Sequence, residues 1–598
     1  MNEPRRRAVI LVAGASLMAL MNSAAVTRAA AAACTEAFCW FGPAVTRVSA
    51  SGAEPGLSAQ AQTGPASADL VILNAIIYTG DAAKPRVEAL AVEGERIVAA
   101  GTSREIRARV GPKTKVVDLK GRFAMPGFND AHIHLASGGL AKLAVELGGS
   151  KSLAAFQQRI RERVKDYRPG DWVVGRGWDH TLWPEKRFPT RQDLDAVSVD
   201  HPMFFTRVDG HVSVANSKAL SLAAITNATP NPSGGEIERD AATGEATGML
   251  KETAASLVSR KIPPPDKEQR RRGILLALAD AARFGITSIQ DNSGWDDFLI
   301  YEQLKGEGLL TVRITEWLPF QASLARLEEM RKRGGTSDPW LKTGALKGVT
   351  DGTLGSRTAA MLAPFADDAS TSGILRIPEA DIRQMTVERD KAGFQIALHA
   401  IGDKANRVSL DAFAEARAAN GTRDSRHRIE HAQVIAPEDF SRFAELGVIA
   451  SMQPVHQSSD MRWAVDRVGP ERAHGAYAWN TFGKRGVRLA FGTDFSVEPM
   501  NPMLGLYACV TRELPGGGPP GGWFPDEKIP LDVCIAAYTQ GSAYAEFEEK
   551  NKGKLAPGMF ADLVVLSADI TQVAAAQLPK TEVLMTFVGG KLVYEKKP

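Results

Sequence analysis

Two histidines separated by one residue, His132 and His134, end the apolar segment RFAMPGFNDAHIHL at residues 122–135. Side chains alternate along a strand, so both imidazoles lie on one face and can bind one metal ion. An HxH pair alone is a modest signal, because it occurs by chance in many proteins. The pair gains weight only if other segments deliver further ligands to the same place.

Four further segments each carry a residue with polar or ligand chemistry at or near the C-terminal end of a short apolar run. These are Lys347 in ALKGVTDG, His399 in FQIALHAIGD, His431 in RHRIEHAQ and Asp494 in RLAFGTDF. Together with the HxH pair they predict a centre for one or two divalent metal ions per chain. Zinc suits imidazole and oxygen ligands, with manganese, iron and cobalt as alternatives.

Lys347 is the least obvious member of this set, because an ammonium group repels cations and cannot coordinate them. The residues alone favour a surface or ion-pairing lysine. Its strand context is informative, since Lys347, Val349 and Asp351 alternate onto one face.

Strands and helical segments alternate through the middle of the chain, which predicts an α/β fold with a parallel sheet. Residues 270–284 (RRRGILLALADAARF) have helical periodicity, and Gly285 then offers a stop. Eight strands with crossover helices make a (β/α)8 TIM barrel, whose active sites lie at the C-terminal strand ends. The eight predicted strands are residues 123–134, 287–291, 311–318, 345–351, 394–401, 426–433, 448–454 and 488–495.

The two chain ends differ from the middle of the chain in their sequence pattern. Residues 68–122 and 554–598 contain short β-rich runs, and neither is long enough to bury a core alone. We expect them to pair into one small composite β-sandwich around a barrel at 123–553. Three βα units need only about 100 residues, so the longer stretch between His134 and Lys347 predicts an insertion at about 140–265, after the first barrel strand.

The first 34 residues have the pattern of a signal peptide: three consecutive arginines, Arg5–Arg7, precede a short apolar run and a run of small residues. Paired arginines resemble a twin-arginine signal, which predicts an exported, periplasmic or secreted protein without a stable membrane span after cleavage. An uncleaved anchor is the minority alternative. Residues 35–67 are rich in Ala, Ser, Gly and Pro and predict a flexible linker.

Overall composition narrows the class of partner. The chain has 598 residues, 44% hydrophobic and 24% charged, with a formal net charge of +3, which gives no electrostatic support for nucleic-acid binding. Cys509 and Cys534 are isolated from each other in sequence, so no disulfide framework is evident. We expect a small-molecule substrate, and the sequence leaves a homodimer open.

The motifs PGFNDAHIH, KGVTDGTLGSRTA, LHAIGD, IEHAQ and FGTDF, in this order and spacing, resemble the amidohydrolase superfamily and within it the YtcJ-like, amidohydrolase-3 branch. The resemblance covers residues from about 68 to 594. It implies a metal-dependent hydrolase with a distorted TIM barrel and a composite β-sandwich. Known members of the branch cleave amide-type bonds, including those of N-substituted formamides.

The resemblance also implies roles for the ligand residues. His132, His134 and Asp494 would bind a buried α metal, His399 and His431 a β metal, and a carbamylated Lys347 would bridge the two. Two metals roughly 3.5–4 Å apart lower the pKa of a bound water towards ~7, which makes hydroxide available at neutral pH. Asp494 would act as general base and then as general acid towards the leaving nitrogen.

Five residues are candidate substrate contacts: Asp351, Arg357, Trp178, His211 and His456. A capping aspartate and a surface ion pair explain Asp351 and Arg357 equally well, and aromatics such as Trp178 are more often local core. Because adjacent strand residues face opposite sides, we expect Glu430 to point away from the metals.

These observations predict a hydrolase that cleaves a C–N bond, of the amide or formamide type and other than a peptide bond, in a small molecule. The alternatives at the same site are ester, carbamate and cyclic-imide hydrolysis. A non-catalytic binding protein on the same fold is the alternative from another class; loss of ligands would favour it, and all six are present.

Overall fold

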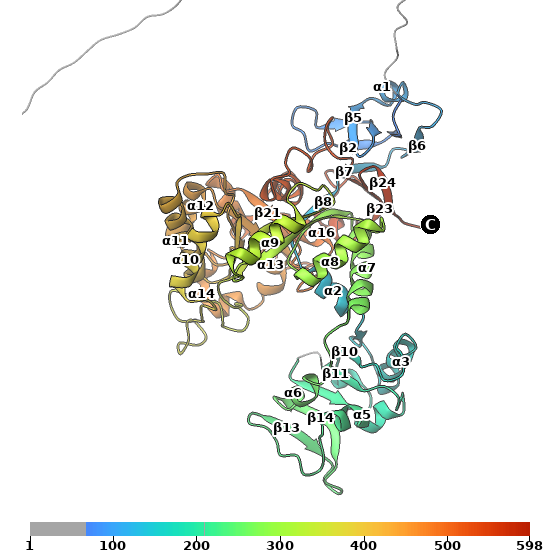
Figure 1. The fold of residues 1–598 in the computed structure, drawn as a ribbon, viewed down its shortest axis with the longest axis vertical. Helices are drawn as coiled ribbons and strands as arrows, with labels where there is room; N and C mark the ends of the chain where they lie inside the picture. The colour runs from blue at the N-terminus through green and yellow to red at the C-terminus, as the bar shows by residue number, and fades with distance from the viewer. Residues whose placement is uncertain (1–66, 208–209, 598) are drawn as a thin grey trace, which may run out of the picture. The chain divides into compact units, whose positions relative to one another are not determined.

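Eight parallel strands form the central sheet of the computed structural model, which describes residues 67–207 and 210–597 (Figure 1). They follow one another around the sheet in chain order, so the predicted parallel barrel is confirmed. The strands are β8 (Phe128–Ile133), β15 (Ile286–Asp291), β16 (Arg313–Pro319), β17 (Leu341–Val349), β18 (Ile396–Ala400), β19 (Arg428–His431), β20 (Ile449–Met452) and β21 (Leu489–Phe491).

The barrel closes between its last and first strands through the residues that follow β21. The Asp494 amide donates to the carbonyl of His132 at 2.8 Å, and the His134 amide donates to the carbonyl of Phe495 at 2.6 Å. Gly492 belongs to the same junction: a Cβ there would lie 2.5 Å from the His132 backbone nitrogen. The close approach that only glycine permits therefore brings Asp494 beside the HxH pair.

Crossover helices cover the barrel and bury one apolar face each. Helix α7 (Lys267–Arg283) begins with a capping box between Asp266 and Gln269 and buries Ile274, Leu278 and Ala281. The other helices that follow barrel strands are α2 (Leu135–Ala141), α8 (Trp295–Gly306), α9 (Leu324–Gly334), α10 (Glu379–Lys391), α11 (Asp403–Asn420), α12 (Phe440–Leu446), α13 (Pro454–Asp460), α14 (Ala464–Ala473), α15 (Trp479–Lys484) and α16 (Pro502–Thr511).

The two chain ends build one β-sandwich, as predicted. One sheet has the order β5-β4-β1-β6 and the other the order β24-β23-β22-β7-β2-β3, which joins strands from both ends. The strands are β1 (Leu70–Leu73), β2 (Ile76–Tyr78), β3 (Arg86–Val87), β4 (Ala89–Glu93), β5 (Arg96–Gly101), β6 (Lys115–Asp118), β7 (Phe123–Pro126), β22 (Leu563–Leu566), β23 (Val583–Val588) and β24 (Lys591–Glu595).

The segment predicted as the first barrel strand, 123–134, is in fact two strands. β7 pairs with β2 and β22 in the sandwich, whereas β8 pairs with β15 in the barrel. Gly127 separates them, and a Cβ at this position would lie 2.2 Å from the Thr287 side chain. The chain therefore passes from sandwich to barrel at a residue whose lack of a side chain allows close packing.

The insertion after β8 forms a sheet of its own, with the order β13-β14-β12-β11-β10-β9. Its apolar cores include Phe156, Trp178, Trp183 and Phe205. The elements are β9 (Val145–Glu146), α3 (Leu153–Val164), β10 (Val173–Trp178), α4 (Arg191–Asp195), β11 (Met203–Arg207), β12 (Val212–Ala215), α5 (Ser217–Leu222), β13 (Gly235–Arg239), β14 (Ala246–Glu252) and α6 (Ala255–Ser259).

A disulfide joins Cys509 on α16 to Cys534 on α17 (Leu531–Ala536). The expectation of isolated cysteines was wrong, because the two residues are 25 apart in sequence and meet only when the two helices pack. The predicted signal peptide and nearly all of the predicted linker lie outside the described residues. Among the residues that are described, no helix is both long and apolar enough to cross a membrane.

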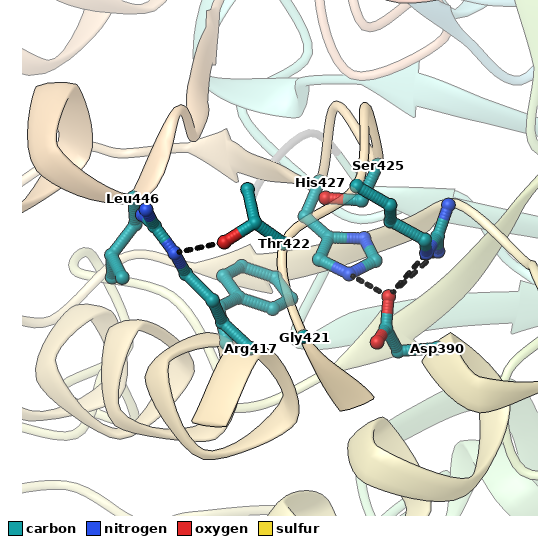
Figure 2. A pocket seen from close by; sticks show the side chains of 9 residues that line it. Asp390, Arg417, Gly421, Thr422, Ser425, His427 and Leu446 are labelled. Carbon is teal, nitrogen blue, oxygen red and sulfur yellow. Dashed lines mark hydrogen bonds and ion pairs between the residues drawn. The ribbon is translucent and has the colours of Figure 1, made fainter. Parts of the chain in front are cut away.

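A small pocket at the N-terminal side of the barrel strands contains a buried polar network (Figure 2). His427, just before β19, accepts from the Ile396 amide through Nδ1 and donates through Nε2 to Asp390 at 3.1 Å. Burial opposes ionisation of Asp390, but hydrogen bonds from His427 and Asn420 and the charge of Arg423 lower its pKa to about 2. This end of a barrel usually serves stability rather than chemistry.

We expect Asp390→Asn to destabilise the fold without changing catalysis. A folded-state pKa below the ordinary Asp value means that the carboxylate stabilises the fold above about pH 4, and that this stabilisation is lost as pH falls towards about 2. The expected loss is about 2 kcal/mol at pH 7. Urea unfolding of both proteins at several pH values measures the difference in their free energies of unfolding. A difference that stays constant down to pH 2 would contradict the expected loss.

Candidate metal centre

Four histidines in or directly after three barrel strands, β8, β18 and β19, meet at the C-terminal end of the barrel. The ring centroids of His132 and His134 are 5.5 Å apart, those of His132 and His431 5.0 Å, and those of His399 and His431 4.5 Å. His132 is fully buried and His431 nearly so. The structure therefore brings together the four histidines that the sequence suggested as metal ligands.

Each of these rings has one nitrogen held by an oxygen, which leaves the other nitrogen available. His132 Nδ1 lies 2.6 Å from Glu430 Oε2, His134 Nδ1 3.0 Å from the Asn292 carbonyl, and His431 Nδ1 2.7 Å from Gln453 Oε1. His399 is held in the opposite sense, with Nε2 3.1 Å from the Gly352 carbonyl. Such contacts to oxygen fix the tautomer and the orientation of metal-binding histidines.

Asp494 completes the cluster from the residues after β21. Its Oδ1 lies 3.2 Å from His134 Nε2 and 3.6 Å from His132 Nε2, and has no hydrogen-bond partner although it is buried. His132, His134 and Asp494 form one group whose ligand atoms lie close enough to hold one ion, and His431, His456 and Asp494 form another. An unpartnered buried carboxylate oxygen facing two imidazole nitrogens is a donor set that fits a divalent cation.

The protonation states suit metal binding. Burial, reinforced by nearby Lys347, lowers the pKa of His132 to about 4 and that of His399 to about 3. Burial and the neighbouring His399 hold the pKa of His431 well below its usual value. Burial opposes ionisation of Asp494, but His132, His134 and His456 hold its pKa well below the usual range. At neutral pH the imidazoles are therefore neutral donors and Asp494 is an anion.

Lys347, near the end of β17, points into the same cluster. Its Nζ lies 3.1 Å from His132 Nε2 and 5.4 Å from the centre of the Trp317 ring. Burial lowers the pKa of this amine to about 8, against the opposing charges of Glu430 and Asp494. This placement excludes the interpretation of Lys347 as a surface lysine. A lowered pKa increases the fraction of uncharged amine, which is the nucleophilic form that reacts with carbon dioxide.

Two candidate ligand residues lie where the backbone leaves the β conformation. φ is +72° at His431 and +54° at Asp494. For residues other than glycine such values are strained and concentrate at functional sites. Here they turn both side chains into the barrel at the point where the strand ends.

We expected alternation to turn Glu430 to the face of the sheet opposite His431, and this was wrong: Glu430 lies inside the barrel, where it contacts His132 on the side away from Lys347 and Asp494. Arg428 and Glu430 are the inward-facing residues of β19, and both are fully buried. His431 is the residue that breaks the alternation, because its positive φ turns it inward as well. The sequence did contain a signal for the inward position of Glu430. Arg428 and Glu430 lie two residues apart in a predicted strand and therefore share a face, and opposite charges on one buried face must pair.

His456 is the predicted substrate contact that the structure brings to the cluster. It lies on α13, with Nε2 3.1 Å from Asp494 Oδ2 and Nδ1 3.5 Å from Glu498. Burial would lower its pKa, but these two carboxylates raise the pKa to about 10, so the ring carries a proton at neutral pH. Sequence reasoning missed Glu498, which has no motif of its own.

Asp351 and Arg357 occupy the long loop after β17. Asp351 is fully buried and accepts hydrogen bonds from the amides of Ala360, Ile401 and Gly402 at 2.8–3.0 Å, with His399 Nε2 at 3.5 Å. Arg357 forms a two-bond ion pair with Asp367. These are the capping and ion-pair arrangements weighed above, and the substrate roles of both residues stay predictions.

The two candidates from the insertion have local partners. Trp178 is fully buried in the core of the insertion, and its Nε1 donates to the Phe205 carbonyl at 3.0 Å. The exposed His211 lies 3.1 Å from Glu252. In this arrangement Trp178 packs against its own lobe, and substrate contact by either residue stays a prediction.

Comparisons with known proteins agree with this geometry. The model of the amidohydrolase family matches residues 115–594. A putative amidohydrolase, YtcJ, of Bacillus subtilis is 33% identical over 87% of this chain and 98% of its own. N-substituted formamide deformylase of Arthrobacter pascens is 28% identical over 88% and 98%.

A solved structure gives the same result for the fold and the chemistry of the family. An uncharacterized metal-dependent hydrolase from Pyrococcus furiosus superimposes with a TM-score of 0.70 and 31% identity, covering 84% of this chain and all of the other. The strand order, the histidine and aspartate cluster and these matches lead to one conclusion. The chain belongs to the amidohydrolase family, whose members include metal-dependent hydrolases.

Proposed function

We propose that this protein hydrolyses a C–N bond, of the amide or formamide type, in a small molecule. The observation that carries the proposal is the environment of Asp494: Oδ1 faces His132 and His134 without a hydrogen-bond partner, and Oδ2 lies 3.1 Å from His456 Nε2. A relative of similar length is named for the deformylation of N-substituted formamides, which supports this class of bond.

The residues that would hold the metal are His132, His134, His399, His431 and Asp494, with a carbamylated Lys347 as the proposed bridge between two ions. A bound divalent cation, which we propose to be zinc, lowers the pKa of water towards ~7 and polarises a carbonyl oxygen. The imidazoles supply donor atoms, and their oxygen partners keep the rings oriented.

The chain's own acid–base group is Asp494. We infer that its carboxylate takes the proton from the attacking water and delivers it to the leaving nitrogen. His456 holds Oδ2, so the carboxylate keeps one orientation during both transfers. An amine is a poor leaving group unless its nitrogen is protonated. An alkoxide of low basicity leaves more easily without a proton. A proton donor in the site, here Asp494, therefore favours amides over esters.

We further propose that the protein is exported. The disulfide between Cys509 and Cys534 supports this, because disulfides persist mainly in oxidising compartments. The arginine-led apolar segment at the N-terminus supports it from the sequence side. Fractionation of the native host followed by N-terminal sequencing of the mature chain is the test.

Metal removal tests the function directly. We expect a chelator to abolish hydrolysis of N-formyl and N-acyl amines, and zinc, manganese or cobalt to restore it at one or two ions per chain. Aryl esters, carbamates and cyclic imides assayed in parallel distinguish the alternative bond types by their kcat/KM. Protein that binds metal but turns over none of these compounds would favour a binding function.

A further inference from the structure

Glu430 makes a short contact with the back of a metal-ligand candidate. Its Oε2 lies 2.6 Å from His132 Nδ1, and both side chains are fully buried. The other nitrogen of the same ring, Nε2, faces Lys347 and Asp494. The carboxylate therefore occupies the side of His132 that is opposite the metal centre.

Two further side chains hold this carboxylate through three contacts. Arg428 Nε donates to Oε1 at 2.5 Å, Arg428 Nη2 reaches Oε2 at 3.3 Å, and the Ser451 hydroxyl donates to Oε2 at 2.8 Å. Arg428 is itself held by the Ala131 carbonyl, by Ser451 and by Gln290, and its guanidinium lies over the Trp317 ring. These groups belong to β8, β15, β16, β19 and β20, so the network spans the barrel interior.

We propose that Glu430 is a positioning residue that sets the tautomer and direction of His132 for metal binding. A carboxylate can only accept a hydrogen bond from Nδ1–H, which leaves the lone pair of the neutral ring on Nε2. The Nε2 atom is thus committed to the centre before any ion arrives. This inference rests on the proposed metal function of the histidine cluster.

The buried charges give Glu430 a second effect on the same ring. Arg428 carries a positive charge within the barrel interior, and the Glu430 carboxylate is its direct partner. Without that carboxylate the guanidinium would stay buried and unpaired, and its field would oppose a cation bound at Nε2. Glu430 therefore favours zinc binding in two ways, by orienting His132 and by neutralising the charge of Arg428. The two effects can be separated by experiment.

The experiment measures the dissociation constant for zinc on apo protein by competition with a chromophoric chelator, alongside urea unfolding of the apo protein. Glu430→Gln offers one acceptor oxygen where the carboxylate accepts four hydrogen bonds, so His132 and Arg428 must compete for it. We expect zinc affinity to fall roughly 10–100-fold, the usual range for loss of such a partner. Gln290→Leu is the matched control, because it removes a buried partner of Arg428 but leaves the contact between His132 and Glu430.

A second variant separates orientation from charge and guards against a folding failure. Arg428→Met/Glu430→Leu replaces both members of the buried pair by apolar side chains, an exchange that often leaves stability unchanged, and leaves no side-chain acceptor at position 430 for His132. We expect this double variant to fold and still to bind zinc weakly, because the carboxylate behind His132 is gone. Recovery of wild-type affinity would show that Glu430 only neutralises Arg428, which overturns the positioning role.

The remaining outcomes also decide the matter. Equal losses of zinc affinity in Glu430→Gln and Gln290→Leu, in proportion to lost stability, would reduce Glu430 to a structural residue and overturn the proposal. Normal affinity in Glu430→Gln would overturn it as well. Absence of zinc binding by the wild-type protein would instead contradict the proposed metal function, and is distinguishable because no variant is needed to see it.

Discussion

Asp494→Asn is expected to reduce kcat by roughly 10²–10⁴-fold, the usual contribution of a general acid–base group. The amide keeps the size of the side chain but has no negative charge beside His132, His134 and His456. It also cannot take a proton from water at neutral pH. Steady-state kinetics on the best amide of the substrate panel, at saturating zinc, measures the effect.

Asp390→Asn is the matched control for this substitution. It replaces another buried aspartate that contacts a histidine, but at the opposite end of the barrel strands. We expect its kcat to match that of the wild-type protein when both are folded. An Asp494→Asn enzyme with wild-type kcat would remove Asp494 from the acid–base role, whatever its effect on zinc affinity.

Lys347→Ala is expected to lower kcat by at least about 100-fold and to lower the metal content, if the lysine provides a bridging ligand for a two-metal site. Burial holds the pKa of this amine at about 8, so roughly a tenth of it is uncharged at pH 7 and able to react with carbon dioxide. Metal analysis of purified protein, with kinetics in buffer depleted of bicarbonate and then replenished, tests both parts.

Lys342→Ala provides the control on the same strand. Lys342 is also buried in β17, but it pairs with Glu548 rather than with the metal cluster. Its loss should cost stability and leave metal content unchanged. Full activity with one metal ion in Lys347→Ala would support a one-metal enzyme in which Lys347 serves only to fill the barrel.

The meeting of the four candidate histidine ligands with Asp494 could be predicted because the sequence pattern of barrel strands is easy to recognise. Each is a short apolar run, and a polar residue at its C-terminal end stands out against that background, as His399 and His431 do. Parallel strands gather those ends on one side of the sheet, so the ligands could be expected to meet although most of them are far apart in sequence. The pairing of the two chain ends could also be predicted, because neither end is long enough to bury a core alone.

What the sequence could not give was the set of contacts made across the barrel. The alternation rule placed Glu430 wrongly because it assumes β geometry throughout, and His431 leaves that geometry at φ +72°. The partnership of Glu498 with His456, and the disulfide between Cys509 and Cys534, depend on how helices and loops pack. No local pattern of residues encodes those distances.

The sandwich has a consequence for how the protein is made. β7, which leads directly into the first barrel strand, lies between β2 and β22, and β22 spans Leu563–Leu566 of a 598-residue chain. At ~5–20 residues per second a ribosome needs roughly half a minute to two minutes to reach that strand. Until then β7 has an open edge, so the two halves of the sandwich cannot close before residues 563–566 have been synthesised. A chain truncated before residue 563 would lack the strand that pairs with β7.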